Sequence, residues 1–141
     1  MKISARNVLP GTVTEINKGA VNAEVAISLR GGGEVVVSII TNASVDRLGL
    51  QKGIEAFAII KASDVMVAKN LENARISARN ILPGVVVEVH DGTVNSEVDI
   101  RLLGGTIIAS TNTKESVLAL QLKRDDEVSA VIKASHVMVG V

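Results

Sequence analysis

The sequence predicts an all-β protein built from two similar small barrels in tandem. The first supporting observation is an internal repeat, since residues 3–68 align with residues 76–140, and such self-similarity defines the folding unit. The second is the alternation of apolar and polar residues over most of each copy, which is the period of half-buried strands. The third is composition: 47% of the residues are hydrophobic, yet Phe57 is the one aromatic. The core must therefore use aliphatic and β-branched side chains, which suit strands.

The repeat divides the chain into a first unit (1–68), a polar linker (69–73) and a second unit (74–141). The second copy is one residue shorter, at the turn where Gly31-Gly32-Gly33 corresponds to Gly104-Gly105. A unit of this size buries only about 60% of its unfolded surface, and this sequence is more apolar than that size can hide. The surplus predicts that the units pack on one another, first within the chain and then between chains.

Each copy is expected to contain about five strands and one short helix. A Pro-Gly turn precedes the first strand, and a glycine hairpin separates the second from the third. Thr41 and Ser44 before the Val45/Leu48 pair indicate a short helical turn with a hydroxyl cap. The expected strands of the first copy cover residues 11–16, 21–29, 34–40, 54–61 and 65–67. This order predicts a small β-barrel of the oligonucleotide/oligosaccharide-binding kind.

Charge and composition exclude several classes of protein. The formal net charge is zero, whereas a general nucleic-acid or anionic-membrane surface needs a basic excess. Single-stranded nucleic-acid binders also use aromatic stacking surfaces, which are missing here. The sequence has no cysteine for a disulfide or thiolate metal site. No apolar run reaches the roughly 18 residues of a membrane span, and the first residues lack a signal-peptide core. A cytoplasmic protein without nucleic-acid or membrane partners is expected.

The most informative stretch is Ser4-Ala5-Arg6-Asn7 ahead of Pro10-Gly11, which returns as Ser77-Ala78-Arg79-Asn80. Taken once, it fits a turn with a local cap about as well as a binding site. Its return favours function, because turns tolerate substitution. Hydroxyl, guanidinium and amide groups are all hydrogen-bond donors, and none is negatively charged. The stretch is therefore interpreted as half of an oxyanion site.

Three further patterns recur. Lys61-Ala62-Ser63 returns as Lys133-Ala134-Ser135, either as a surface lysine and a bend or as the other half of the oxyanion site. Thr41 and Ser44 return as Thr113 and Ser116, which fits an N-cap and a helix N-terminal anion site equally well. Val21-Asn22 and Val94-Asn95 follow a glycine turn and are a weaker indication of a second polar site.

Other candidates carry less weight. The glycine hairpin lies between strands, whereas a phosphate loop opens a helix. His90 and His136 correspond to Asn17 and Asp64 in the first copy, which argues against a symmetric metal site. The recurring pair Glu24 and Glu97 fits solubilising groups or ion pairs between the units better than catalysis. No catalytic triad or metal-ligand pattern is present in the sequence, so no catalytic or metal-ligating residue is predicted.

These motifs, in this order and spacing, resemble the Mop domain of the molbindins, which are small cytoplasmic molybdate- and tungstate-binding proteins. The resemblance covers nearly the whole chain twice and implies the two-domain type. It implies five-stranded barrels, a homotrimer of two-domain chains, and oxyanions bound between domains for intracellular storage or homeostasis. The implied ligands are Ser4, Ala5, Arg6, Asn7, Thr41, Ser44, Lys61, Ala62, Ser63, Ser77, Ala78, Arg79, Asn80, Thr113, Ser116, Lys133, Ala134 and Ser135. A second type of site on the three-fold axis is assigned to Val21, Asn22, Val94 and Asn95.

Molybdate is a tetrahedral dianion that accepts hydrogen bonds and donates none at neutral pH, so donors without carboxylates suit it. No acid–base residue is required, and no enzyme is expected. Two alternatives remain open. One is a generic anion-binding or oligonucleotide- or partner-binding oligomer, and the other is an enzyme subunit that handles phosphate esters.

Overall fold

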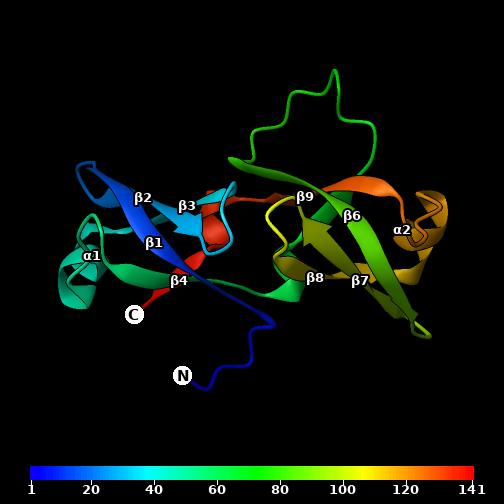
Figure 1. Ribbon diagram of the computed structural model, residues 1–141, viewed down its shortest axis with the longest axis horizontal. Helices are drawn as coiled ribbons and strands as arrows, with labels where there is room; N and C mark the ends of the chain where they lie inside the picture. Colours follow the sequence, from blue (N-terminus) through cyan, green and yellow to red (C-terminus); the bar gives the residue numbers. More distant parts are fainter.

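The computed structural model describes residues 1–141 and is nearly all β, with two curled five-stranded sheets side by side (Figure 1). Each repeat contributes five strands, one short α-helix and one 3₁₀ turn, as the sequence predicts in kind. The elements of the first repeat are β1 (Asn7–Lys18), β2 (Asn22–Leu29), β3 (Val35–Thr41), α1 (Asn42–Leu48), β4 (Glu55–Ile60), η1 (Ala62–Asp64) and β5 (Met66–Ala68). Those of the second are β6 (Asn80–Asp91), β7 (Asn95–Leu102), β8 (Ile107–Thr113), α2 (Lys114–Ala119), β9 (Glu127–Ile132), η2 (Ala134–His136) and β10 (Met138–Gly140).

The last strand of each repeat belongs to the sheet of the other repeat. The first sheet has the order β10-β4-β1-β2-β3, and the second has the order β5-β9-β6-β7-β8, with antiparallel pairing throughout. In Figure 1 the C-terminal segment accordingly crosses back into the lobe that contains β1. The expectation that each repeat completes its own barrel is wrong in this respect. The physical reason is that the turn after β4 or β9 lies against the other repeat, so the short strand that follows starts at the neighbouring sheet.

The expected Pro-Gly turns are also wrong, because Pro10-Gly11 and Pro83-Gly84 lie inside the long strands β1 and β6. Proline is tolerated where its missing N–H is not required by the ladder. The carbonyl of Pro10 accepts a hydrogen bond from Arg30 N (2.9 Å), so its nitrogen also points to the β2 side, where strand pairing begins only at Gly11. Glycine is required at the next position, since a Cβ on Gly11 would collide with Ser28 O and Ile27 Cγ2.

The two sheets enclose one continuous hydrophobic core. Its 26 buried residues come from both repeats and are all Val, Ile, Leu or Ala. Val13 and Ile27 of the first sheet and Val86 and Ile100 of the second are fully buried in this cluster. The shared core therefore holds the two repeats together.

No helix of the protein combines the length and apolar character needed to cross a membrane.

Candidate oxyanion-binding site

The Lys-Ala-Ser segments form two 3₁₀ turns near the middle of the molecule (Figure 1). In both turns the alanine, Ala62 or Ala134, is buried, whereas the flanking lysine and serine are exposed. Asp64 N donates to Lys61 O and His136 N donates to Lys133 O, both at 2.9 Å, which closes each turn. The buried alanine anchors the turn, so its lysine and serine, Lys61 with Ser63 or Lys133 with Ser135, are presented to solvent.

The two turns lie next to each other across the boundary between the repeats. His136 Nδ1 is 3.4 Å from Asp64 Oδ1, and these residues occupy equivalent positions in the two turns. Each turn is also tied to a strand of the other repeat, because Ser110 Oγ donates to Val65 O and Ser38 Oγ donates to Val137 O. Both serines are completely buried. The strand exchange thus brings together two segments that are 72 residues apart in the sequence.

The Ser-Ala-Arg-Asn segments divide into exposed and buried parts. Ser4 and Ser77 are exposed, as are both arginines, whereas Ala78 is buried and Ala5 is half-buried. The Asn7 side chain is 2% exposed and binds Ala109 of the other repeat twice, donating from Nδ2 to the carbonyl and accepting from the N–H at Oδ1, both at 2.8 Å. Asn80 makes the same two 2.8 Å bonds with Val37. Both amides already hold the repeats together, and a role in ligand binding stays a prediction for them.

Both motif arginines form ion pairs with a glutamate of the other repeat. Arg6 donates from Nη1 and Nη2 to the two oxygens of Glu97, at 2.6 and 2.8 Å. Arg79 Nη1 donates to Glu24 Oε1 at 2.7 Å. From the sequence, these glutamates fit either solubilising groups or ion pairs between the units, and in the structure both form such ion pairs. A guanidinium has five N–H donors, so each arginine retains donors beyond those taken by its glutamate.

The Thr-Ser pairs cap the two α-helices, as the sequence predicts. Thr41 Oγ1 accepts from Ser44 N and donates to Ser44 Oγ, at 3.1 and 3.0 Å. Thr113 and Ser116 make the same contacts at 3.1 and 2.8 Å. The helices lie at the two outer ends of the molecule, far from the central Lys-Ala-Ser turns (Figure 1). A single chain therefore does not bring these hydroxyls to the turns.

The Val-Asn pairs lie beside these helix caps. Asn22 and Asn95 pair across the sheet with Thr41 and Thr113. Val21 O accepts from Asn42 N at 2.8 Å and Val94 O accepts from Lys114 N at 2.9 Å. The two valine side chains are 69% and 73% exposed, unusually high for apolar residues. Each outer end of the molecule thus combines an exposed valine, an asparagine and two hydroxyls.

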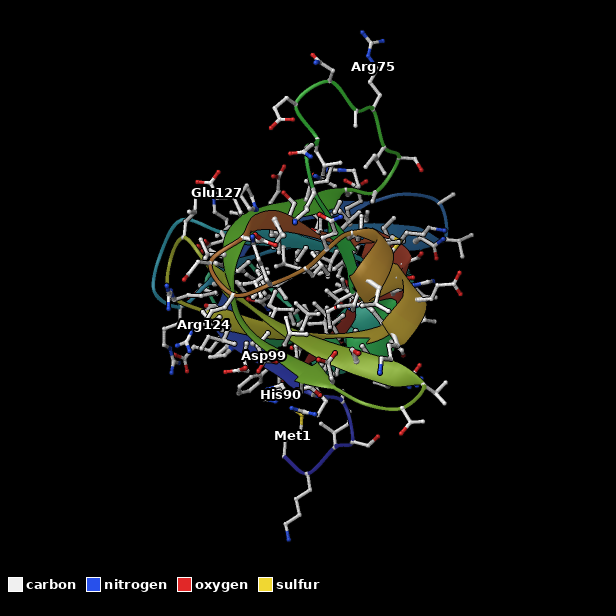
Figure 2. All side chains as sticks on the ribbon, turned by 90° about the vertical axis from the view of Figure 1, so that its right-hand side faces the viewer. Met1, Arg75, His90, Asp99, Arg124 and Glu127 are labelled. Carbon is white, nitrogen blue, oxygen red and sulfur yellow. The ribbon has the colours of Figure 1, made fainter.

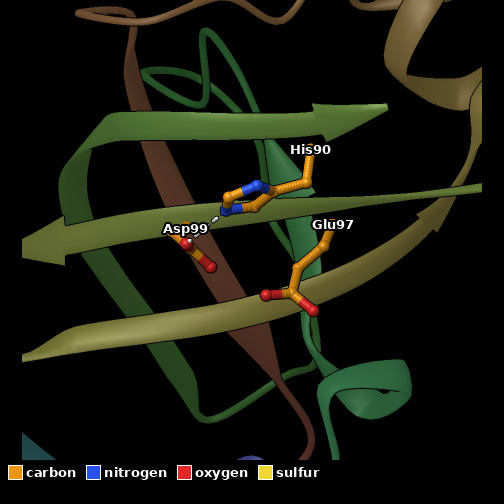
Figure 3. Close-up of side chains that lie close together, drawn as sticks. All are labelled: His90, Glu97 and Asp99. Atoms are coloured by element: carbon orange, nitrogen blue, oxygen red, sulfur yellow. Dashed lines mark hydrogen bonds and ion pairs between the residues drawn. The ribbon is translucent and has the colours of Figure 1, made fainter. Parts of the chain in front are cut away.

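Sequence reasoning missed one cluster, formed by His90, Glu97 and Asp99 (Figure 3). The first repeat has Asn17 at the position of His90, so repetition does not point to this histidine. The signal that identifies the cluster is cross-strand register rather than repetition. His90 of β6 pairs with Glu97 of β7, and Asp99 lies two residues further along the same face of β7.

Comparison with known proteins places the chain in a family. The model of the TOBE domain matches residues 3–67 and again residues 76–139. The chain belongs to the TOBE-domain family. The two matches cover nearly the whole sequence and correspond to the two repeats, and the relatives below confirm the resemblance to Mop-domain proteins.

Several relatives of this chain are described as molybdate-binding or molybdenum-pterin-binding proteins. A solved structure of the cytoplasmic molybdate-binding protein ModG with molybdate bound is 49% identical, with a TM-score of 0.95 over 100% of this chain and 99% of that one. The molybdenum-pterin-binding protein MopA of Rhodobacter capsulatus is 42% identical over 141 residues, which are 100% of this chain and 53% of that protein. A probable molybdenum-pterin-binding protein of Haemophilus influenzae is 55% identical over 67 residues, 48% of this chain and 96% of that protein. The chain thus spans about half the length of the longer curated relatives, such as MopA, and the full length of ModG.

Proposed function

We propose that this TOBE-domain protein binds molybdate, and tungstate in the same way, for intracellular molybdenum storage and homeostasis. The observation that carries the proposal is the full-length similarity to ModG, a protein that holds molybdate, at 49% identity and a TM-score of 0.95. The recurring donor motifs add chemical support. Lysine, arginine, hydroxyl and backbone N–H groups stabilise an unprotonated tetrahedral dianion without making or breaking a bond, so the role is binding rather than catalysis.

The central Lys-Ala-Ser turns are one half of the proposed oxyanion site. Lys61 and Lys133 are exposed and make no ion pair within the chain, so both ammonium groups are available to an anion. Arg6 and Arg79 contribute the donors that their glutamates leave free. The ligand enters as cargo, and no catalytic cofactor is involved.

The assembly that we propose is a cytoplasmic homotrimer in which residues 1–68 and 74–141, joined by the linker 69–73, supply two sets of sites. The hydroxyl pairs and the Val-Asn pairs lie at the outer ends of one chain, away from the Lys-Ala-Ser turns. Neighbouring chains would complete both kinds of site, with the exposed Val21 and Val94 packed near a three-fold axis. Gel filtration with light scattering should give a mass of three chains, and a stable monomer contradicts this assembly.

Competition dialysis with labelled molybdate tests the proposed ligand. Tungstate should displace molybdate at equal concentration. Phosphate should compete least, because hydrogen phosphate carries a proton that needs an acceptor and the recurring motifs offer donors. Sulfate should compete weakly, because its shorter bonds do not reach donors spaced for molybdate. Displacement by equimolar phosphate or sulfate would leave only a generic anion-binding protein.

Substitution of the turn lysines tests the site. Lys61→Ala and Lys133→Ala should each weaken molybdate binding about ten-fold or more, since a hydrogen bond to a charged group contributes about 1.5–3 kcal/mol. Lys52→Ala is the matched control, because Lys52 is also exposed but lies outside the recurring motifs. Calorimetric titration should show normal binding in the control. Unchanged binding in both turn variants would mean that these lysines are only surface charge.

A further inference from the structure

The second repeat carries a cluster of metal-ligating side chains that the first repeat lacks. Figure 2 shows His90 and Asp99 together on one side of the molecule, opposite Arg75. The potential ligand atoms of His90, Glu97 and Asp99 all lie within 4.8 Å of one another (Figure 3). His90 Nε2 is 3.1 Å from Asp99 Oδ2. None of these residues belongs to the recurring oxyanion motifs.

The sheet fixes this arrangement. His90 on β6 stands directly across from Glu97 on β7, and Asp99 follows Glu97 at the two-residue spacing that returns to the same face. Glu88, across from Asp99, lies on this face as well. Because His90, Glu97 and Asp99 are held on two paired strands, their side chains need only small rotations to reach one metal ion.

The geometry points to a divalent transition-metal site, and we propose that His90, Glu97 and Asp99 bind Zn²⁺ or a similar first-row ion. Two ligands of a tetrahedral zinc, each about 2.0–2.1 Å from the metal, are about 3.3 Å apart. The observed 3.1 Å between His90 Nε2 and Asp99 Oδ2 is close to that spacing. Imidazole with carboxylates favours zinc and its neighbours over calcium or magnesium, which prefer oxygen ligands alone.

Charge and burial agree with a cation at this place. The side chains of Glu97 and Asp99 are each 22% exposed, and that of His90 is 57% exposed. The two carboxylates are therefore sheltered, while the imidazole is open to solvent. Glu97 also accepts two hydrogen bonds from Arg6. An ionised carboxylate offers about four lone-pair positions, so Glu97 retains capacity for a metal while it holds Arg6. A metal bound at His90 Nε2 occupies the position of a proton on that nitrogen, so the N–H of the neutral, metal-bound imidazole is on Nδ1.

The first repeat provides a natural negative comparison. Its equivalent face carries Asn17 in place of His90, Glu24 in place of Glu97 and Ala26 in place of Asp99. There the Asn17 amide donates to Glu15 instead (3.1 Å). The glutamate and its arginine partner are common to both repeats, and only the histidine and the aspartate are specific to the second. The proposed site is therefore present once per chain.

Calorimetric titration of the full chain with ZnCl₂ tests the proposal. We expect one Zn²⁺ per chain. The double variant His90→Asn/Asp99→Ala, which gives these two positions the residues of the first repeat, should lose this site. Each single substitution should weaken binding at least about ten-fold, since even partners outside the ligand set contribute 10–100-fold. His136→Asn removes the one other histidine and should leave the stoichiometry at one.

The reciprocal variant Asn17→His/Ala26→Asp copies the second repeat into the first and should bind two Zn²⁺ per chain. It keeps the test decisive if the loss variant does not fold, which circular dichroism would reveal. Equal zinc binding by the wild type and the His90→Asn/Asp99→Ala variant would overturn the proposal. So would loss of the site in His136→Asn, or a single site in the reciprocal variant.

Discussion

The two repeats differ on the outer faces of their first hairpins and make the same contacts where they meet. Asn7 and Asn80, Ser38 and Ser110, and both arginine–glutamate pairs make equivalent contacts across the boundary. By contrast, the β1–β2 face carries Asn17 and Ala26 where the β6–β7 face carries His90 and Asp99. A residue can therefore recur in this sequence because it contacts the other repeat, and not only because it contacts a ligand. A residue that recurs need not touch the oxyanion.

The Asn7 and Asn80 contacts are the strongest test of this comparison. Asn7→Ala should lower the free energy of unfolding by about 2–4 kcal/mol, because a buried N–H and a buried carbonyl of Ala109 both lose their partner. Asn80→Ala should cost less, since its bonds to Val37 are only partly buried and water can replace them. Denaturant unfolding measures both values. Asn73→Ala, in the exposed linker, should stay within about 0.5 kcal/mol, and equal losses in all three variants would contradict a structural role for these amides.

The buried serines should behave alike in the two repeats. Ser38→Ala and Ser110→Ala should each destabilise the protein by about 1–2 kcal/mol, because each hydroxyl donates to the carbonyl immediately before an exchanged strand. Thermal unfolding of the two variants should therefore give similar shifts. Ser28→Ala, at a half-buried position of β2, serves as the control. A large effect in one serine variant only would show that the two exchanged strands are held differently.

The exposed ion pairs should contribute less than about 1 kcal/mol each. Glu97→Gln should have the larger effect, because Glu97 is bidentate and its side chain is 22% exposed, against 41% for Glu24. Both effects should shrink as salt concentration rises. Unfolding measured in low and high NaCl separates this screening from packing, and salt-independent losses would show that the glutamates act through their shape.

The smallest effect should come from Asp126, which has no counterpart because the first repeat has Ile54 there. A hydrogen bond from the Lys69 side chain, together with one from the backbone N–H of Lys123, lowers the pKa of the Asp126 carboxyl below its ordinary value of 3.8. A lowered pKa stabilises the fold above the ordinary value, and this contribution disappears as pH falls through the lowered one. Asp126→Asn should therefore be less stable than the wild type at neutral pH and converge with it in acid. The free energy of unfolding of both proteins should be measured as a function of pH. A difference between them that stays constant down to acid pH would contradict this linkage.

The strands and helix caps were predictable because local patterns determine them. Alternation located β2 and β7, and Thr41 and Thr113 cap α1 and α2 as their spacing indicates. The exchange of β5 and β10 was not predictable, since their pairing partners are decided by which edge lies nearest after folding. The Pro-Gly segments were misjudged because proline and glycine also occur inside a strand where pairing is one-sided. For the candidate site, local patterns indicated the donors, but the buried bonds of Asn7 depend on Ala109, which lies 102 residues away.

The exchange of β5 and β10 also determines when the protein can be completed on the ribosome. Translation delivers β1 to β4 first, but the strand that covers the outer edge of β4 is Met138–Gly140, which is made only after β6 to β9. Until they emerge, the nascent chain presents an open strand edge, and β5 has no partner before Glu127–Ile132 has been synthesised. Open edges of this kind promote aggregation. A chain whose synthesis stops before Met138 therefore lacks the last strand of the first sheet, although the other four strands of that sheet have been made.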